Sequence, residues 1–362
     1  MQRLIRLTAT WGVITACVSI LSGCYVMQAA TGQAVVIYRS EPIGVVVANP
    51  ATAQDTRDRL LLVESARAFA INELALPDGR SYRTYADLGR PYVVHNVVAT
   101  PEFSVEPRRW CFPVAGCVSY RGYFNEERAR SYALRLASRG DDVSVDGAPT
   151  YSTLGHLPDP VFGSMLAWRD TRLVGTIFHE LAHERLYFPG DSALNEAFAS
   201  VVEIEGVRRW LQQAGRASEI AGYEATIARQ KEFAALLLDA RALLAWLYAT
   251  KLPPEQMRIE KQREFGRLHY RYEVMRHERW QGYPGYDAWF ARSLNNAHLA
   301  AVATYEDCVP GLQRALQAAG GSLPEFYARV EATRGMTPQE RRARLCVQEG
   351  KKGQEGREGM ER

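Results

Sequence analysis

From Asp170 to Cys346 the sequence is patterned almost continuously as helices, which constrains the fold more than any other feature. Apolar residues recur there every three or four positions, and glycine or proline separates successive runs. We predict helices over residues 171–187, 192–213, 216–250, 254–278, 285–305, 310–319, 323–333 and 337–346. This half of the chain therefore commits the protein to a largely helical body.

The preceding region mixes helix and strand patterns. Its expected elements are helices at 57–76 and 126–138 and strand-like segments at 92–98, 110–124 and 143–154. We expect one α+β domain, in which a small mixed β region (about 80–155) is followed by a predominantly helical region.

The composition is that of a globular protein and excludes several classes. Of 362 residues, 47% are hydrophobic and 23% charged, so a disordered, collagen-like or multi-span membrane protein is not expected. The 44 basic and 41 acidic side chains give a formal net charge of +3, which offers no basic footprint for nucleic acid. We expect no nucleic-acid partner.

The N-terminus has the pattern of an export signal. Arg3 and Arg6 precede a short apolar run, which ends in Leu21-Ser22-Gly23-Cys24. This tetrapeptide resembles the bacterial lipoprotein signal, which implies cleavage after residues 1–23 and a lipid on Cys24 that anchors the chain in a membrane. An ordinary signal peptide or a signal anchor is the alternative. Because Tyr25 and not aspartate follows the cysteine, the resemblance implies the outer membrane, with the body facing the periplasm.

Removal of the signal leaves 42 basic and 41 acidic side chains, because the segment contains only two charged residues. Residues 24–347 then form the expected domain. The tail at 348–362 is rich in Gly, Lys, Glu and Arg, has no apolar residue except Met360, and is predicted to be disordered.

His179-Glu180-Leu181-Ala182-His183 is an HExxH sequence. Two histidines four residues apart lie on one face of a helix, where both imidazoles can bind one metal ion. The surrounding helix is strongly apolar, so these polar groups need partners. A polar surface helix is the alternative interpretation.

Glu196 is the expected third ligand. Phe188-Pro189-Gly190 ends the first helix, and Asp191 or Ser192 can cap the next, just as Asp170 can cap the first. Glu196 then lies in the first turns of the second helix and faces back across the break. Two histidines and one glutamate, with a fourth position open to water, form the thermolysin-type zinc arrangement.

The motifs together resemble the gluzincin peptidases, and most closely the bacterial zinc aminopeptidase lipoproteins. The segments that carry the resemblance are Cys111 to Phe124, Tyr151 to Gly155, His179 to His183, Asn195 to Ala199, and Ala303 to Tyr305. The resemblance covers nearly all of residues 24–340. It implies a zinc-metallopeptidase-like domain, one Zn²⁺ per chain, a peptide substrate and aminopeptidase activity.

Several roles follow from peptidase chemistry. Glu180 would take a proton from the attacking water and pass it to the leaving amine. Glu203 shares a helix face with Glu196 and could orient a ligand histidine, although a solvated carboxylate is the alternative. Asn195 could cap or position the second helix.

Assignments for substrate binding are less direct. Tyr151, Ser152 and Thr153 form a strand-like stretch that could pair with a substrate backbone, or be a plain structural strand. Tyr305 is the first candidate for stabilising the oxyanion, because it shares a polar set with Asn295, Asn296 and His298. The further candidates are Tyr120, Arg121 and Tyr123 for the oxyanion, and Glu126, Glu127, Asp159 and Glu306 for the substrate's α-ammonium group.

Four cysteines remain after lipidation and signal removal, namely Cys111, Cys117, Cys308 and Cys346, and they allow three pairings. Pro113 and Gly116 favour a tight loop closed by Cys111–Cys117. A Cys308–Cys346 disulfide would link the last helices, and free buried thiols are the alternative for this pair.

The sequence thus predicts a zinc peptidase of the bacterial cell envelope, with aminopeptidase activity the first hypothesis. The alternatives are a zinc endopeptidase that acts on envelope proteins or cell-wall peptides, and a non-catalytic envelope lipoprotein that keeps the scaffold for binding. The intact set of His179, Glu180, His183 and Glu196 argues against the last of these.

Overall fold

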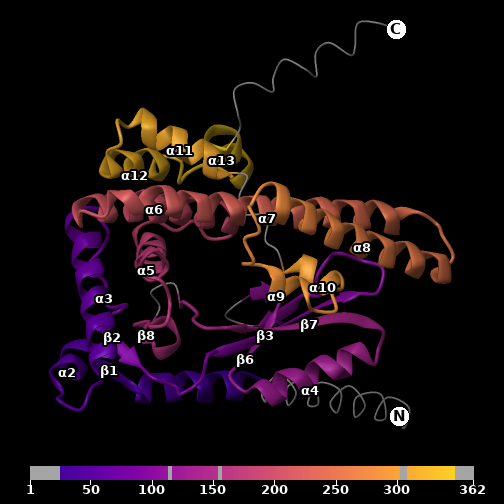
Figure 1. Ribbon diagram of the computed structural model, residues 1–362, viewed down its shortest axis with the longest axis horizontal. Helices are drawn as coiled ribbons and strands as arrows, with labels where there is room; N and C mark the ends of the chain where they lie inside the picture. Colours follow the sequence, from indigo (N-terminus) through magenta and orange to yellow (C-terminus); the bar gives the residue numbers. More distant parts are fainter. Residues whose placement is uncertain (1–24, 113–115, 154–156, 302–307, 347–362) are drawn as a thin grey trace, which may run out of the picture.

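The computed structural model describes residues 25–112, 116–153, 157–301 and 308–346, and in this part of the chain the expected α+β fold is confirmed. Small sheets occupy one side of a mostly helical body (Figure 1). Helix α6 (Ser192–Gln213) runs from one edge of the molecule toward its middle, with α5 (Asp170–Arg185) on one side and the C-terminal helices on the other. Cys24, the signal segment and the C-terminal tail lie outside the described residues.

The other helices flank this centre. Before α5, the chain forms a helix over residues 25–38, then α2 (Ile43–Ala48), α3 (Gln54–Asn72) and α4 (Glu126–Ala137). After α6 come α7 (Ile220–Ala249), α8 (Pro254–Glu278), α9 (Asp287–Phe290), α10 (Asn296–Ala300), α11 (Val309–Ala318), α12 (Leu323–Glu331) and α13 (Pro338–Leu345). Within the described ranges, no helix combines the length and the apolar character needed to cross a membrane.

Within the described residues, the strands form three small sheets. One has the order β1 (Ser40–Pro42), β2 (Thr84–Ala86) and β8 (Val161–Phe162), with β2 parallel to β8. The second has the order β6 (Arg121–Tyr123), β3 (Val94–Pro101) and β7 (Asp141–Ala148), all antiparallel to their neighbours. The third pairs β4 (Trp110–Phe112) with β5 (Gly116–Val118), in a hairpin that the disulfide Cys111–Cys117 crosses.

The main core lies where α3, α5 and α6 meet, and its packing explains one glycine. Gly206 of α6 faces Leu74 and the ring of Phe178, and a β-carbon at this position would lie 2.7 Å from each. Leu74 and Phe178 are themselves fully buried. The absence of a side chain at Gly206 therefore sets how closely α6 approaches α5.

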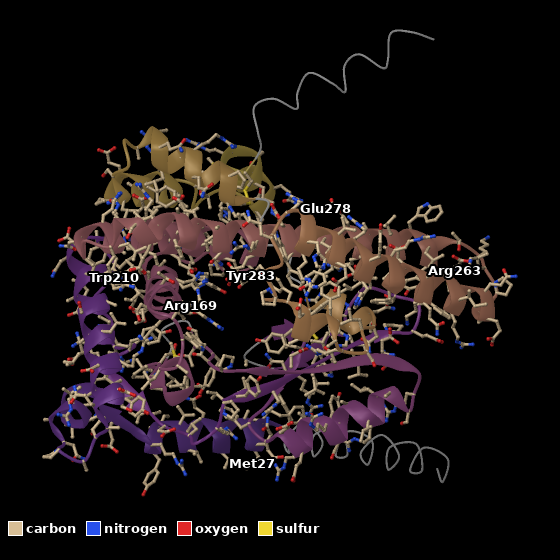
Figure 2. The ribbon with its side chains drawn as sticks, viewed as in Figure 1. Met27, Arg169, Trp210, Arg263, Glu278 and Tyr283 are labelled. Carbon is tan, nitrogen blue, oxygen red and sulfur yellow. A yellow bond between two sulfur atoms is a disulfide. The ribbon has the colours of Figure 1, made fainter. Side chains whose placement is uncertain are left out.

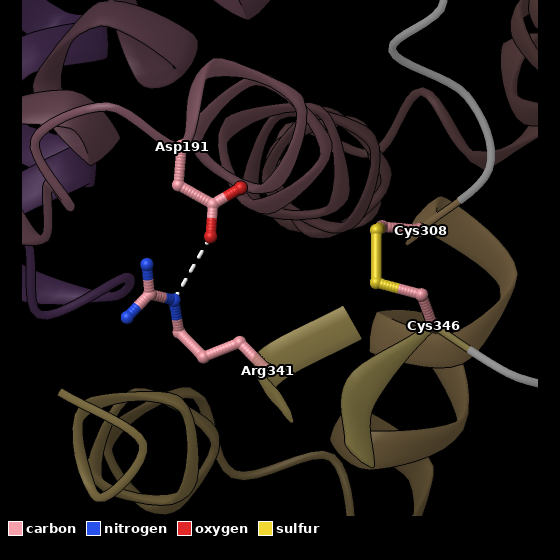
Figure 3. The surroundings of a disulfide bond; sticks show 4 residues. All are labelled: Asp191, Cys308, Arg341 and Cys346. Atoms are coloured by element: carbon pink, nitrogen blue, oxygen red, sulfur yellow. Dashed lines mark hydrogen bonds and ion pairs between the residues drawn. A yellow bond between two sulfur atoms is a disulfide. The ribbon is translucent and has the colours of Figure 1, made fainter. Parts of the chain in front are cut away.

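The C-terminal helices α11–α13 pack as a layer on the far side of α6 and are held there in two ways (Figures 1 and 3). A disulfide joins Cys308 to Cys346, the two ends of the layer. Arg341 of α13 donates to Asp191, 2.9 Å away, and both side chains are buried. Asp191 immediately precedes α6, so the last helix of the chain is fastened to the break between α5 and α6.

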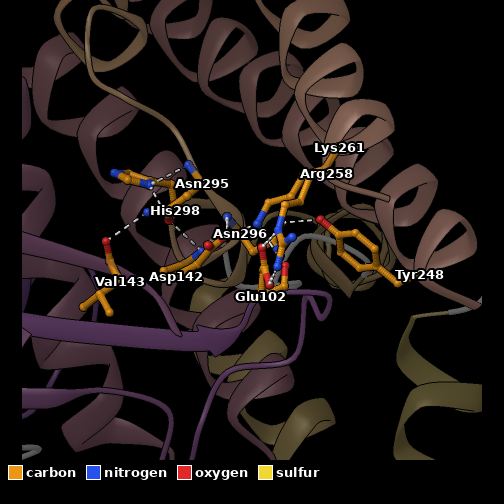
Figure 4. Close-up of polar contacts among 10 residues, drawn as sticks. Glu102, Asp142, Val143, Tyr248, Arg258, Lys261, Asn295, Asn296 and His298 are labelled. Carbon is orange, nitrogen blue, oxygen red and sulfur yellow. Dashed lines mark hydrogen bonds and ion pairs between the residues drawn. The ribbon is translucent and has the colours of Figure 1, made fainter. Parts of the chain in front are cut away.

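A polar network fastens α10 to the second sheet (Figure 4). Asn295 donates to the carbonyl oxygen of Val143, and the backbone N–H of Asn296 donates to Asp142. Lys261 of α8 donates to the same Asp142 carboxylate at 2.6 Å. The polar set that the sequence associated with Tyr305 therefore serves a structural contact, and Tyr305 itself lies outside the described residues.

Most expected elements are confirmed, with the helices at 192–213 and 254–278 matching to the residue. The single helix expected over 285–305 is wrong: α9 and α10 are short and separated by residues 291–295. Asp170 is the first residue of α5 and not its cap, because its carboxylate pairs with Arg59 and Arg216. The helix at 25–38 was not expected.

We predict that Gly206→Ala destabilises the protein by about 1 to 3 kcal/mol, because a methyl group would overlap Leu74 and Phe178. The measurement is the free energy of unfolding in urea. Gly222→Ala is the matched control, since Gly222 lies in α7 with open space around it and alanine there should stabilise by about 0.5 to 1 kcal/mol. Equal effects of the two substitutions would contradict the packing argument.

Candidate metal centre

Helix α5 presents His179, Glu180 and His183 because an apolar stripe buries its other face. Leu173, Val174 and Ile177 are fully buried in the main core, as the apolar pattern predicts. The two histidines stand one turn apart, with ring centroids 4.9 Å from each other. Both rings therefore face the same side of the helix.

Helix α6 brings Glu196 to these rings. The Nε2 atom of His179 lies 3.3 Å from Glu196 Oε2, and the Nε2 atom of His183 lies 3.6 Å from Glu196 Oε1. One donor atom of each residue falls within 4.8 Å of the other two. The three residues predicted as metal ligands are thus brought together.

The spacing of these atoms suits a tetrahedral metal ion. Two ligand atoms bound to one zinc at about 2.1 Å lie about 3.4 Å apart at tetrahedral angles. The observed nitrogen–oxygen distances are 3.3 and 3.6 Å. Two imidazoles and a carboxylate are also donors that zinc accepts, so the residues present fit a zinc ion.

The charges of the cluster are strongly coupled. Burial by itself would lower the pKa of His179, but hydrogen bonds with Glu196 and Glu203 raise it to about 10. Burial and the charge on His179 lower the pKa of His183 to about 4. His183 is therefore neutral, as a ligand must be, whereas the Nε2 atom of His179 must release a proton before it can bind a metal.

Glu203 fixes the orientation of His179. Its Oε2 atom lies 3.0 Å from the Nδ1 atom of that ring, which leaves Nε2 directed toward Glu196. A carboxylate behind a ligand histidine is a common arrangement in metal sites. The side chain of Glu203 passes close to Gly175 of α5, where a β-carbon would come within 3.0 Å of Glu203 Oε1.

Asn195 holds the break between the two helices. Its side-chain oxygen accepts from the backbone N–H of Phe188 at 2.8 Å, and its amide donates to the carbonyl oxygen of Phe188 at 2.9 Å. The side chain is buried, with 1% of its surface exposed. This clamp fixes the path of the chain just before Glu196, so Asn195 positions the second helix. The N-terminal cap expected from Asp191 is absent, since its carboxylate pairs with Arg341 and makes no cap hydrogen bond.

Glu180 lies in a partly buried position next to the cluster. Burial raises its pKa, while the charge on His179 and a hydrogen bond with Ser152 act in the opposite direction. Its Oε2 atom is buried and has no hydrogen-bond partner in the described part of the chain. The carboxylate therefore keeps an oxygen available to accept a proton.

The strand predicted through Tyr151, Ser152 and Thr153 is wrong, because β7 ends at Ala148 and these residues form no strand. Asp159 organises them instead: its carboxylate accepts from the hydroxyl of Ser152 and from the N–H and hydroxyl of Thr153 at 2.8 to 3.0 Å. Tyr151 packs its ring against Phe162. The segment reaches the cluster through Ser152, which contacts Glu180.

The other candidates are dispersed. Arg121 of β6 stacks over the ring of Tyr25 at 4.1 Å and also over Tyr123, which places both candidates in a separate aromatic group. Glu126 pairs with Arg130, one turn along the exposed face of α4. In the part of the chain that the structure describes, neither Tyr120 nor Glu127 makes a hydrogen bond or ion pair with the cluster. Glu306, like Tyr305, lies outside the described residues.

Sequence reasoning missed Tyr82. This residue has a φ of 59°, which is rare for a bulky side chain, and only 2% of its surface is exposed. Its N–H donates to the carbonyl oxygen of Asp159 at 2.7 Å, and the charges of Glu180 and Asp159 both act on its hydroxyl. Because the contact spans 77 positions, no local pattern in the sequence could have indicated it.

Comparison with known proteins gives one match. A family model described as "Putative aminopeptidase" matches residues 24–345. No curated protein sequence and no solved structure matches the chain.

We predict that Asn195→Ala lowers the free energy of unfolding by about 1 to 3 kcal/mol, because it leaves the N–H of Phe188 without a partner, whereas the carbonyl oxygen of Phe188 still accepts from the N–H of Asp191. Urea denaturation measures the loss. Gln212→Ala, an exposed change on the same helix, should alter stability by no more than about 0.5 kcal/mol. A loss for Asn195→Ala as small as that control would show that the clamp is dispensable.

Proposed function

Because this chain belongs to the aminopeptidase family whose model matches residues 24–345, we propose that it is a zinc-dependent aminopeptidase held in the bacterial cell envelope. In this proposal a lipid on Cys24 anchors the chain in a membrane, and the body faces the periplasm. The membrane is the outer one, because the residue after the cysteine is Tyr25 and not aspartate. Family membership supports a peptidase activity. The zinc ion and the lipid anchor are proposed from the residues of this chain.

The convergence of His179, His183 and Glu196 carries the zinc proposal. These residues would hold the ion, and Glu203 would keep the His179 ring in its binding orientation. When bound, zinc supplies a Lewis acid that polarises a peptide carbonyl and lowers the pKa of water. The remaining tasks of hydrolysis fall to side chains of the protein.

Glu180 is the proton carrier in this proposal. It adjoins His179 in the sequence, so it lies beside the ligand set, and its unpartnered Oε2 can accept a proton from the attacking water. Burial raises its pKa, which makes the carboxylate a stronger base than an exposed glutamate. The same atom can then return the proton to the amine that leaves.

Ser152 and Asp159 support this role, because both interact with Glu180. Ser152 contacts Glu180, and its hydroxyl donates to Asp159 Oδ2 at 3.0 Å, so it links the two carboxylates, with a single proton that goes to one of them at a time. Asp159 is also the one described member of the four candidate acids that interacts with Glu180. Its buried negative charge near the cluster favours a substrate with a free α-ammonium group, which is the aminopeptidase choice.

We predict that Glu180→Gln reduces hydrolysis of amino-acid amides by about 100- to 10,000-fold and leaves one zinc per chain. The amide has nearly the shape of the carboxylate but cannot take the proton. The measurements are metal content by elemental analysis and release of the amine product. His183→Ala is the comparison variant, and it should lose metal and activity together.

The outcomes separate the alternatives. Unchanged hydrolysis by Glu180→Gln, or a wild-type chain without zinc, would refute the zinc-peptidase proposal. Activity on N-acetylated peptides equal to that on free peptides would identify an endopeptidase. Bound zinc without hydrolysis of any peptide would leave the non-catalytic envelope lipoprotein as the function.

We also predict that Glu203→Ala weakens zinc binding by about 10- to 100-fold, because His179 loses the group that orients it. Competition with a chelating dye measures the affinity. Glu203→Gln should lose less, since its amide oxygen can still accept from Nδ1. Glu205→Ala, two residues along α6, should not change the affinity, because Glu205 pairs with Arg208 and Arg209. An equal loss in both alanine variants would point to a general effect on α6.

A further inference from the structure

The helix at residues 25–38 is firmly attached along one face. Tyr25 lies under the guanidinium of Arg121, and Gln28 donates to the carbonyl oxygen of Gly122 at 3.1 Å. Gly32 lies so close to the ring of Phe124 that a β-carbon would overlap it, and Val36 is fully buried. The helix therefore has a defined inner face and a defined outer face.

The outer face carries no charge, which is unusual for an exposed helix. No charged residue occurs between positions 25 and 38. The outward side chains are Val26, Met27, Ala30, Thr31, Ala34, Val35, Ile37 and Tyr38, and Tyr38 is 89% exposed. Figure 2 shows Met27 at the outer edge of the molecule, far from α6 and the C-terminal layer. We call this set the apolar stripe.

Beside the stripe is a groove of about 820 Å³ between the helix, the segment at Leu88 and the start of α4. Arg39, Arg90 and Arg128 line it, and no acidic residue does. Arg39 and Arg90 donate to backbone carbonyl oxygens. Among the described residues, no carboxylate forms an ion pair with any of the three arginines. Burial and the charge of Arg39 lower the pKa of Arg90, which reflects positive charge that no carboxylate offsets.

We propose that the apolar stripe and the arginine groove form one membrane-contact surface, with the stripe in the headgroup region and the groove bound to the phosphate of an anionic phospholipid. Amphipathic helices bind to bilayer surfaces with an apolar face in the headgroup region while basic side chains attract anionic lipids, and here the basic side chains come from the groove beside the helix. The proposal takes from the proposed function the lipid on Cys24, and it is independent of the zinc chemistry.

The position of the surface in the chain identifies a membrane as its occupant. The described part of the helix starts at residue 25, and in the sequence the apolar segment and Cys24 come immediately before it. A second protein would not explain why the stripe adjoins the one cysteine that has a lipid-attachment sequence.

The consequence is a fixed orientation. In Figure 1 the helix at 25–38 runs along one edge of the molecule, while α6 and the C-terminal layer lie at the opposite edge. If the stripe lies on the bilayer, α5 and its histidines are held between these edges, away from the lipid. A chain tethered by the lipid alone would have no preferred orientation.

A single spin label, placed at either of two positions in separate variants, tests the surface. The full chain is reconstituted in phosphatidylcholine vesicles, with or without about 30% phosphatidylglycerol. A nitroxide is attached at Tyr38→Cys or at Tyr270→Cys, a tyrosine on α8 that is also exposed, at 70%. Collision with oxygen relative to an aqueous nickel complex reports immersion. We expect this ratio to be at least about fivefold higher at position 38 than at position 270.

The arginines have their own test. Anionic lipid should move the label at position 38 deeper into the bilayer. The triple variant Arg39→Gln, Arg90→Gln, Arg128→Gln should abolish that change, because each arginine contributes about fivefold to the affinity for an anionic surface. The matched control is Arg342→Gln, Arg344→Gln, two exposed arginines on α13. If the triple variant does not fold, Arg39→Gln alone should give a partial loss.

The outcomes decide between the parts. Equal water access at positions 38 and 270 would overturn the membrane-contact surface, and immersion at 270 alone would place the contact on α8. Equal immersion of the label at position 38 in vesicles with and without phosphatidylglycerol would overturn the proposed phosphate site in the groove. Metal content and amide hydrolysis in the same vesicles test the peptidase separately, and the mass of the N-terminal peptide tests the lipid on Cys24.

Discussion

The close packing of α5 on α6 is the contact on which the candidate site depends. Helix α5 carries two of the three candidate donors and α6 carries the third, so a small change in the separation of the helices would move Glu196 away from the histidines. Two glycines permit the approach, because neither has a side chain. Gly206 leaves room for Leu74 and Phe178, and Gly175 leaves room for the side chain of Glu203. The same packing that fills the core thus sets the nitrogen–oxygen distances of 3.3 and 3.6 Å.

Local sequence patterns predicted the parts of the site that lie within one or two helices. The four-residue spacing placed His179 and His183 on one face, and the proline and glycine after Phe188 located the helix break. The seven-residue spacing from Glu196 put Glu203 on the correct face, and its contact with His179 follows from that. These features succeed because helical periodicity and helix ends are set by neighbouring residues.

The failures lie where distant contacts override the local pattern. Residues 285–305 have helical spacing, but Asn295 binds a carbonyl oxygen of β7 and Asn296 binds that of Glu102, just after β3, which interrupts the helix. Tyr151 and Thr153 have strand character, but Pro149 follows the end of β7 and Asp159 binds the segment in another conformation. The sequence indicates no element at 25–38, because this run has no charged residue to mark a polar helix face.

The bond between Arg341 and Asp191 also has a consequence for the order in which the protein matures. Asp191 is synthesised 150 residues before its partner, and without that partner it would be a buried charge that opposes the closing of the α5–α6 break. The disulfide that secures the layer carrying Arg341 forms only under oxidising conditions. A chain whose last helix has not been made, or whose disulfide has not formed, therefore lacks the last support of the α5–α6 break, and completion of the candidate site is deferred until the whole chain is present and oxidised.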